Sequence, residues 1–289
     1  MTGGNHRRGL LITAAGALVL TPDALLLRLA GAEATTAVFW RGVLLTTAMG
    51  LGLLVAYRGQ FLARLRAIGW IGIAVGFLYG LEATLFVFAI SNTSVANTVI
   101  IVSTAPLFAA SMSWLFLREH IPPRTWAAIA AGLVGIGIVV WDGLELGTGL
   151  GDAAALGSGL GFAAALVLVR RARDTDMLPA MSLGGVISAA LVLPLSPALA
   201  LPLASALPLW TTGVVVLPLA FAAFTIGPRH ISAAEVGLLM LLQTVLGPVW
   251  VWLALGEAMT TRGLIGGGIV VVTLAVHSAV GLRRGQGGS

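Results

Sequence analysis

Residues 114–119 read W-L-F-L-R-E, and residues 252–257 read W-L-A-L-G-E, so the same W-L-x-L-x-E pattern returns 138 positions further along the chain. The same shift also aligns Ser94 with Ser232, Ala96 with Ala234, and Arg124 with Arg262. In both copies the pattern ends an apolar stretch, and an Arg opens the next one. We therefore predict two repeats, at residues 1–143 and 144–289.

The chain between these landmarks is too apolar for a soluble protein. Hydrophobic residues make up 58% of the 289 positions, charged residues 9%, and the mean hydropathy is +1.02. Soluble domains contain roughly 45–50% apolar and roughly 25% charged residues, and a membrane-crossing helix needs roughly 20 apolar residues. We predict an all-α integral membrane protein with ten transmembrane helices, at 9–30, 33–56, 67–90, 94–117, 124–142, 150–170, 178–198, 207–228, 233–255 and 262–282.

The arginines predict how these helices are oriented. Thirteen of the sixteen basic residues, all Arg, lie in gaps on one face of the predicted bundle or at the two chain ends. Basic residues favour the cytoplasmic side, so we predict that both termini are cytoplasmic. Because five helices per repeat is an odd number, the two repeats enter the membrane in opposite senses. Inverted repeats of this kind favour a site near the midplane and alternating access to it.

Several motifs resemble a known family. They are Trp40-Arg41, the A-I-S-N-T-S-V-A-N stretch at 89–97, Pro106, the F-L-R-E at 116–119 and the L-A-L-G-E-A-M-T-T-R-G at 253–263. On these motifs the chain resembles the drug/metabolite transporter superfamily, in particular its ten-helix EamA-type branch. The resemblance implies a secondary transporter in the bacterial inner membrane. Within this superfamily the chain is similar to bacterial exporters of aromatic and other amino acids. That similarity implies a small-molecule substrate.

Three charged residues fall deep inside predicted helices. At about 1.5 Å per residue, Asp23, Arg41 and Glu82 lie roughly 10–14 Å below the outer surface, where they form one buried layer. Charges at such depth usually face the interior of a bundle. One interpretation is that Arg41 holds a substrate carboxylate and Glu82 its ammonium group. The other is that Asp23 or Glu82 only neutralises Arg41 and joins the helices.

The fourth and ninth helices supply further candidates, since the repeat makes them partners beside a central cavity. Asn97, Ile101 and Thr104 share one face of the fourth helix, and Leu239 and Gln243 share one face of the ninth. An amide such as Gln243 near the bilayer centre contacts substrate or makes an interhelical hydrogen bond. Four aromatic residues complete the predicted substrate site, as walls of an apolar pocket or as ordinary packing: Trp40, Tyr79, Phe86 and Phe162.

Four acidic residues are predicted to take part in gating or coupling: Asp23, Glu119, Glu235 and Glu257. Other chemistry is not indicated. The chain has no Cys, the four His show no metal-ligand spacing, and the G-x-G-x-G at 157–161 lacks the Lys of a phosphate-binding loop. We therefore predict no metal, no cofactor and no nucleic-acid partner, and membrane lipids as surroundings. The sequence leaves open whether the protein is a monomer or a homodimer.

A carrier of amino acids is the favoured function, with a carrier of drugs, sugars or cations as the first alternative. In that alternative Glu82 accepts the proton or the cation. An intramembrane enzyme needs clustered acid, base or metal-binding residues at an interface, and the sequence shows none. A channel or a structural subunit does not need two halves in opposite orientation.

Overall fold

The computed structural model describes residues 3–93, 95–141, 149–195, 200–201, 203–255 and 261–286. In the first predicted repeat these residues form α1 (Gly3–Leu20), α2 (Asp23–Ala30), α3 (Ala34–Tyr57), η1 (Arg58–Gln60), α4 (Phe61–Ala67), α5 (Gly69–Asn92), α6 (Val95–Val102), α7 (Ala105–Leu117) and α8 (Pro123–Val140). In the second they form α9 (Leu150–Arg171), α10 (Leu178–Val192), η3 (Leu193–Leu195), α11 (Leu203–Trp210), η4 (Thr211–Val216), α12 (Leu217–Ile226), η5 (Gly227–Arg229), α13 (Ala233–Leu255) and α14 (Thr261–Gln286). No strand occurs among the described residues.

The helices match the predicted spans closely. In the described part of the chain, nine helical stretches are long and apolar enough to cross a membrane, and a shorter apolar helix covers Pro123–Val139. Helix bounds such as Ala233–Leu255 and Leu150–Arg171 lie within one residue of the prediction. A multi-pass helical membrane protein is thus confirmed, while ten crossings, inverted repeats and cytoplasmic termini stay predictions.

The structure adds breaks inside three predicted spans. The first span divides at Thr21-Pro22, the fourth divides at Ser103-Thr104, and the eighth passes through the π-helical turn η4. Proline has no backbone N–H and fixes its own φ, so Pro22 favours the first break. Irregular backbone at membrane depth is tolerated only where protein or a water-filled cavity surrounds it. The breaks therefore indicate segments that face the interior of the bundle.

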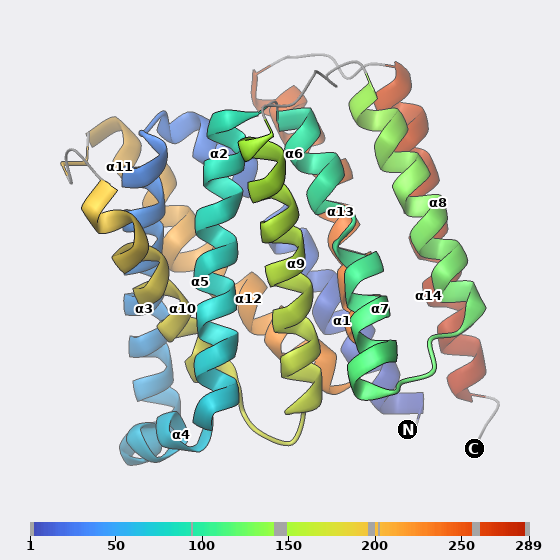
Figure 1. Cartoon of the computed structure of the whole chain (residues 1–289), viewed down its shortest axis with the longest axis horizontal. Coiled ribbons are helices and arrows are strands. Elements are labelled where there is room, and N and C mark those ends of the chain that lie inside the picture. The colour runs from blue at the N-terminus through green and yellow to red at the C-terminus, as the bar shows by residue number, and fades with distance from the viewer. Residues whose placement is uncertain are drawn as a thin grey trace.

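Glycine sets how closely the helices pack. In Figure 1, α3, α5 and α10 stand at one side of the bundle, α8 and α14 pair at the other, and α9 lies between them. A Cβ atom on Gly42 of α3 would lie 2.5 Å from the carbonyl oxygen of Gly185 of α10, and one on Gly135 of α8 would lie 2.9 Å from that of Gly266 of α14. Only glycine permits these backbones to approach so closely.

The two ends of the bundle differ in charge. We call the end that carries α4, the α7–α8 loop, the α9–α10 loop and η5 the arginine-rich end; it is drawn at the bottom of Figure 1. The first residues of α1 and the last of α14 lie at this same end. It is the end that the sequence predicts to be cytoplasmic.

Candidate functional site

An ion pair joins the first two predicted spans. Asp23 opens α2 directly after the break at Pro22, and Arg41 lies about two turns into α3 from its first residue, Ala34. The Arg41 Nη2 donates to Asp23 Oδ2 at 2.7 Å, with 13% and 16% of the two side chains exposed. The sequence predicts these residues in one layer, and the structure shows that Asp23 neutralises Arg41.

Glu82 is the third member of the layer, and it forms no ion pair with any described residue. It is half-buried near the middle of α5 and accepts a long hydrogen bond from Ser158 Oγ at 3.4 Å. A Cβ atom on Gly161, one turn further along α9, would lie 3.6 Å from Glu82 Cβ, so α9 presents little bulk to the carboxylate. The charges of Arg41 and Asp23 act on Glu82 from the neighbouring helices.

Aromatic rings lie one helical turn from Glu82. The Tyr79 ring lies 6.1 Å from that of Phe162 and 5.5 Å from that of Phe221, between ring centroids. Phe162 in turn contacts Phe224, at 6.3 Å edge to face. Tyr79 and Phe162 are thus predicted substrate residues that the structure places together, and they form an apolar wall between α5, α9 and α12.

The predicted residues of α6, α7 and α13 lie where these helices meet α9. Ile101 packs with Ala154 and Ala155 of α9, and Thr104 Oγ1 donates to the Ile101 carbonyl at 2.5 Å, which satisfies backbone at the α6–α7 break. Leu239 belongs to the same buried cluster as Tyr79 and Phe162. Gln243, one turn further along α13, is half-buried.

Three predicted substrate residues have other neighbours. Trp40 packs against Ala30 and Leu209 at the end opposite the arginine-rich one. Phe86 packs against Val38 and Val192, between α3 and α10. Asn97 Nδ2 donates to Thr93 Oγ1 at 3.3 Å, and Thr93 Oγ1 donates to Asp152 at 2.9 Å. These contacts account for the three side chains as packing and as hydrogen bonds between helices.

Two of the predicted gating residues lie at the arginine-rich end. Arg170, only 7% exposed, donates from Nε to Glu119 Oε1 at 2.7 Å and from Nη1 to the Pro228 carbonyl at 2.9 Å. Glu235 lies in the first turn of α13, near two histidines, His6 and His277. Glu257 lies outside the described residues.

The sequence does not reveal Ser158, the buried Arg170 or the two histidines. Ser158 lies in a glycine-rich stretch that gives no sign of a binding role, and the position of Arg170 predicts a solvated cytoplasmic charge. His6 and His277 lie 271 positions apart in separate helices. Their positions depend on tertiary contacts, for which sequence spacing gives no signal. Among the described residues, no group of three His, Asp or Glu is arranged to hold a metal ion.

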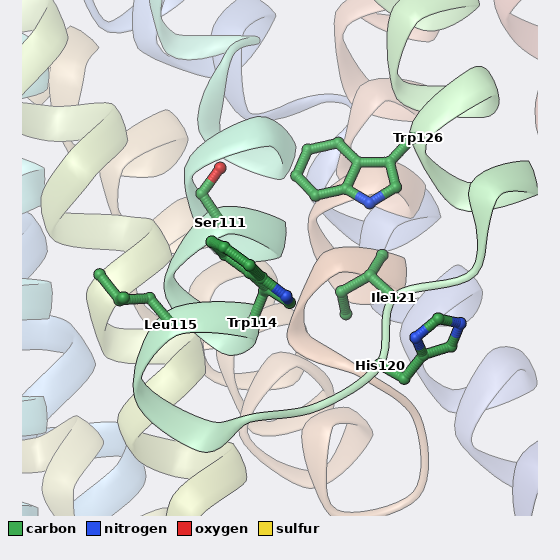
Figure 2. A pocket seen from close by; sticks show the side chains of 6 residues that line it. All are labelled: Ser111, Trp114, Leu115, His120, Ile121 and Trp126. Atoms are coloured by element: carbon green, nitrogen blue, oxygen red, sulfur yellow. The ribbon is translucent and has the colours of Figure 1, made fainter.

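A separate pocket of about 450 Å³ opens between α7 and α8 at the arginine-rich end. Figure 2 shows Trp114 of α7 and Trp126 of α8 on its two sides, with His120 and Ile121 on the connecting loop. Trp114 is 64% exposed. None of the predicted substrate residues lines this pocket, so it is distinct from the region around Glu82.

Comparison with known proteins agrees with this architecture. Residues 8–141 match the EamA-like transporter family. An uncharacterized transporter of Archaeoglobus fulgidus is 26% identical over 193 residues, which are 66% of this chain and 70% of that protein. A solved crystal structure superposes with a TM-score of 0.83 over 96% of this chain and 99% of its own, at 19% identity, and that likeness concerns the fold alone.

Proposed function

We propose that the chain is a membrane transporter of the EamA-like family, whose model matches residues 8–141, and that it carries small organic amines, amino acids foremost among them. The solute binds beside Glu82, and the site opens to one side of the membrane at a time. The resemblance to bacterial exporters gives outward movement across the inner membrane as the expected direction.

The unpaired carboxylate of Glu82 carries this proposal. An ionised carboxylate deep in a membrane protein is costly unless a positive group meets it. Arg41 does not supply this positive group, because it already pairs with Asp23. Ser158 supplies only a long hydrogen bond. The ammonium group of a solute would supply the missing charge. Glu82 is therefore the residue expected to change partners during transport.

The neighbouring rings favour a solute with an apolar side. Tyr79 precedes Glu82 by one helical turn and lies against Phe162. Aromatic faces attract cations and pack on other rings. A molecule that carries an ammonium group next to an apolar or aromatic group fits both features.

Two inverted halves would give such a site its alternating access. Under the 138-residue shift, α3 corresponds to α10, α7 to α13 and α8 to α14, and each of these helices packs against its counterpart. A pseudo-twofold axis through the bundle produces such pairs. This packing supports the predicted division at residues 143 and 144 and rocking of one half against the other.

The test is transport by the purified protein in liposomes, with three related solutes: phenylalanine, phenethylamine and phenylpropionate. We expect the two amines to be carried and the plain acid to be excluded. Glu82→Gln should lower amine transport at least about tenfold, equivalent to about 1.4 kcal/mol. Glu33→Gln, at an exposed carboxylate before α3, is the matched control. Normal transport by Glu82→Gln, or preference for the acid, would refute the proposal.

A carrier of organic cations is the second candidate, because Asp23 already engages Arg41. A guanidinium has five N–H donors, however, and those not used on Asp23 remain for a substrate carboxylate. Transport by the Arg41→Gln variant distinguishes the two candidate functions. An amino acid carrier should lose phenylalanine transport and keep phenethylamine transport, whereas a cation carrier should keep both.

A further inference from the structure

One carboxylate oxygen at the arginine-rich end faces two histidines. Glu235 Oε1 lies 3.7 Å from His6 Nε2 and 3.8 Å from His277 Nε2. The three side chains come from α13, α1 and α14, and they are 11%, 20% and 5% exposed, respectively. The cluster thus joins three helices that are far apart in sequence. His6 belongs to the first predicted half, and the other two residues belong to the second.

The other oxygen of Glu235 is occupied by a helix cap. Ser232 donates to Glu235 Oε2 from its backbone N at 3.0 Å and from Oγ at 2.9 Å, and Glu235 N donates back to Ser232 Oγ at 3.2 Å. This reciprocal pattern is a capping box at the start of α13. It fixes the carboxylate in place and leaves Oε1 to the histidines.

Among the described residues, neither imidazole has another hydrogen-bond partner. His6 Nε2 and both ring nitrogens of His277 are buried without a hydrogen bond among the described residues. Buried polar atoms of this kind are costly to leave unmet. A carboxylate only accepts hydrogen bonds, and a protonated imidazole has two N–H donors. One added proton would therefore provide both a donor and an attractive charge at the same oxygen.

Some of the other charges at this end are engaged elsewhere, and some act on a different histidine. Arg170 pairs with Glu119, and Arg229 donates to the Arg173 carbonyl. Burial, followed by the charges of Arg8, Arg229 and Arg170, lowers the pKa of His230. The ionisable groups at this end, on the elements around the start of α13, are His6, Arg7, Arg8, Arg118, Glu119, His120, Arg124, Arg170, Arg171, Arg229, His230, His277, Arg283 and Arg284. Of these, His6 and His277 are the ones that act on Glu235.

We propose that His6, Glu235 and His277 form a proton-binding site that holds the arginine-rich end closed. The bound proton draws α1 toward α13 and α14, and its loss allows α1 to separate from them. The closed end then binds more protons than the open end, so acid favours closure and rising pH favours opening. This inference rests on the proposed alternating access, and it adds the proton as the ligand that opposes opening toward the predicted cytoplasmic side.

The test is a distance measurement that needs no substrate. Because the natural chain has no Cys, spin labels can be placed on single introduced cysteines at Asn5 of α1 and Ala279 of α14, both exposed. In lipid nanodiscs we expect the short distance to dominate at pH 5 and a longer one to grow by pH 8. Glu235→Gln keeps the capping box, because Gln also fills its third position, and should abolish the pH response.

The variants His6→Gln and His277→Gln should each weaken the pH response. His120→Gln, at an exposed site, and His230→Gln, at a histidine whose pKa is lowered, are the controls and should leave the response unchanged. A pH-independent distance, or a response that survives in Glu235→Gln, would overturn the proton site. Failure of amine transport with an intact pH response would instead count against Glu82 as the solute site.

Discussion

The two ends of the bundle connect the predicted halves by different chemistry. At the arginine-rich end the connections among the described residues include the ion pairs of Glu119 with Arg170 and of Arg64 with Asp176, and the contact of His6 with Glu235, which is charged only when the histidine is protonated. At the opposite end two are hydrogen bonds between neutral groups, from Trp250 Nε1 to Thr21 at 2.7 Å and from Ser205 Oγ to the Ala30 carbonyl at 2.5 Å, and in a third Thr93 donates to the Asp152 carboxylate at 2.9 Å. The Asp23–Arg41 ion pair is nearer that end, but both residues belong to one half.

This difference bears on how each end opens. Charged contacts are stronger than neutral hydrogen bonds at low dielectric, and their strength changes with protonation. Neutral hydrogen bonds between membrane helices contribute little individually, about 0.6 kcal/mol on average. The arginine-rich end should therefore be the more firmly closed and the more sensitive to pH. The opposite end should open at a smaller energetic cost.

The largest effect should come from Arg170→Ala. This change leaves the partly buried Glu119 without its cation and the Pro228 carbonyl without a donor. We expect the free energy of unfolding to fall by about 3 kcal/mol, at the low end of the range for breaking a buried pair, because Glu119 retains some solvent. Unfolding in detergent, followed by tryptophan fluorescence, measures it. Arg171→Ala, at the exposed neighbour, is the control, and an equal loss there would contradict the comparison.

The spans were predictable because the bilayer itself dictates them. A helix that crosses the hydrocarbon core must be apolar for roughly 20 residues, so composition alone places α9 and α13 within one residue of their bounds. The breaks were less visible. Pro22 predicts a kink, but no residue type in Thr211–Val216 predicts a π-helical turn. Such a turn depends on how the neighbouring helices pack.

The sequence predicts how deep the charged residues of the site lie in the membrane, but it does not predict which of them form an ion pair. Counting residues along the helices places Asp23, Arg41 and Glu82 in one layer, and in the structure the first two form an ion pair. Which carboxylate takes Arg41 depends on how the helices rotate, and a single sequence does not encode that in its spacing. The same holds for His6 and His277, whose proximity to Glu235 arises only when α1, α13 and α14 pack together.

The next largest loss of stability should come from a contact that lies part way between the two ends of the bundle. There α3 and α10 hold the predicted halves together through glycine. On Gly42→Ala the new Cβ would meet the Gly185 carbonyl oxygen at 2.5 Å and Ser188 Oγ at 2.6 Å. We expect a loss of about 2–3 kcal/mol, because the backbone atom must move. Gly52→Ala, on the same helix with nothing within 4 Å, should be neutral. Equal unfolding curves for the two variants would show that the halves do not depend on this contact.

The Asp23–Arg41 pair should affect stability without affecting opening of the arginine-rich end, since both residues lie in one half. In a double-mutant cycle of Asp23→Asn and Arg41→Gln, we expect a coupling of about 1–2 kcal/mol in unfolding. A maleimide reacting with a cysteine placed at Thr13, buried near η5, reports opening of the arginine-rich end. Labelling should rise in Arg170→Ala and stay unchanged in the double variant. A rise in the double variant would mean that this pair also controls that end.

The smallest change in stability should come from Trp250→Phe, which removes one hydrogen bond between α13 and the α1–α2 break. Thr21 Oγ1 still donates to the Leu18 carbonyl at 2.7 Å, so the loss should be about 0.6 kcal/mol. Trp252→Phe, at a ring 47% exposed, is the control. Because opening at this end requires that hydrogen bond to break, Trp250→Phe should still raise maleimide labelling of a cysteine at Gln243. If labelling in Trp250→Phe stayed at the level of the control, the neutral hydrogen bonds would not limit opening of this end. The difference between charged and neutral contacts could then not explain why the two ends open at different energetic cost.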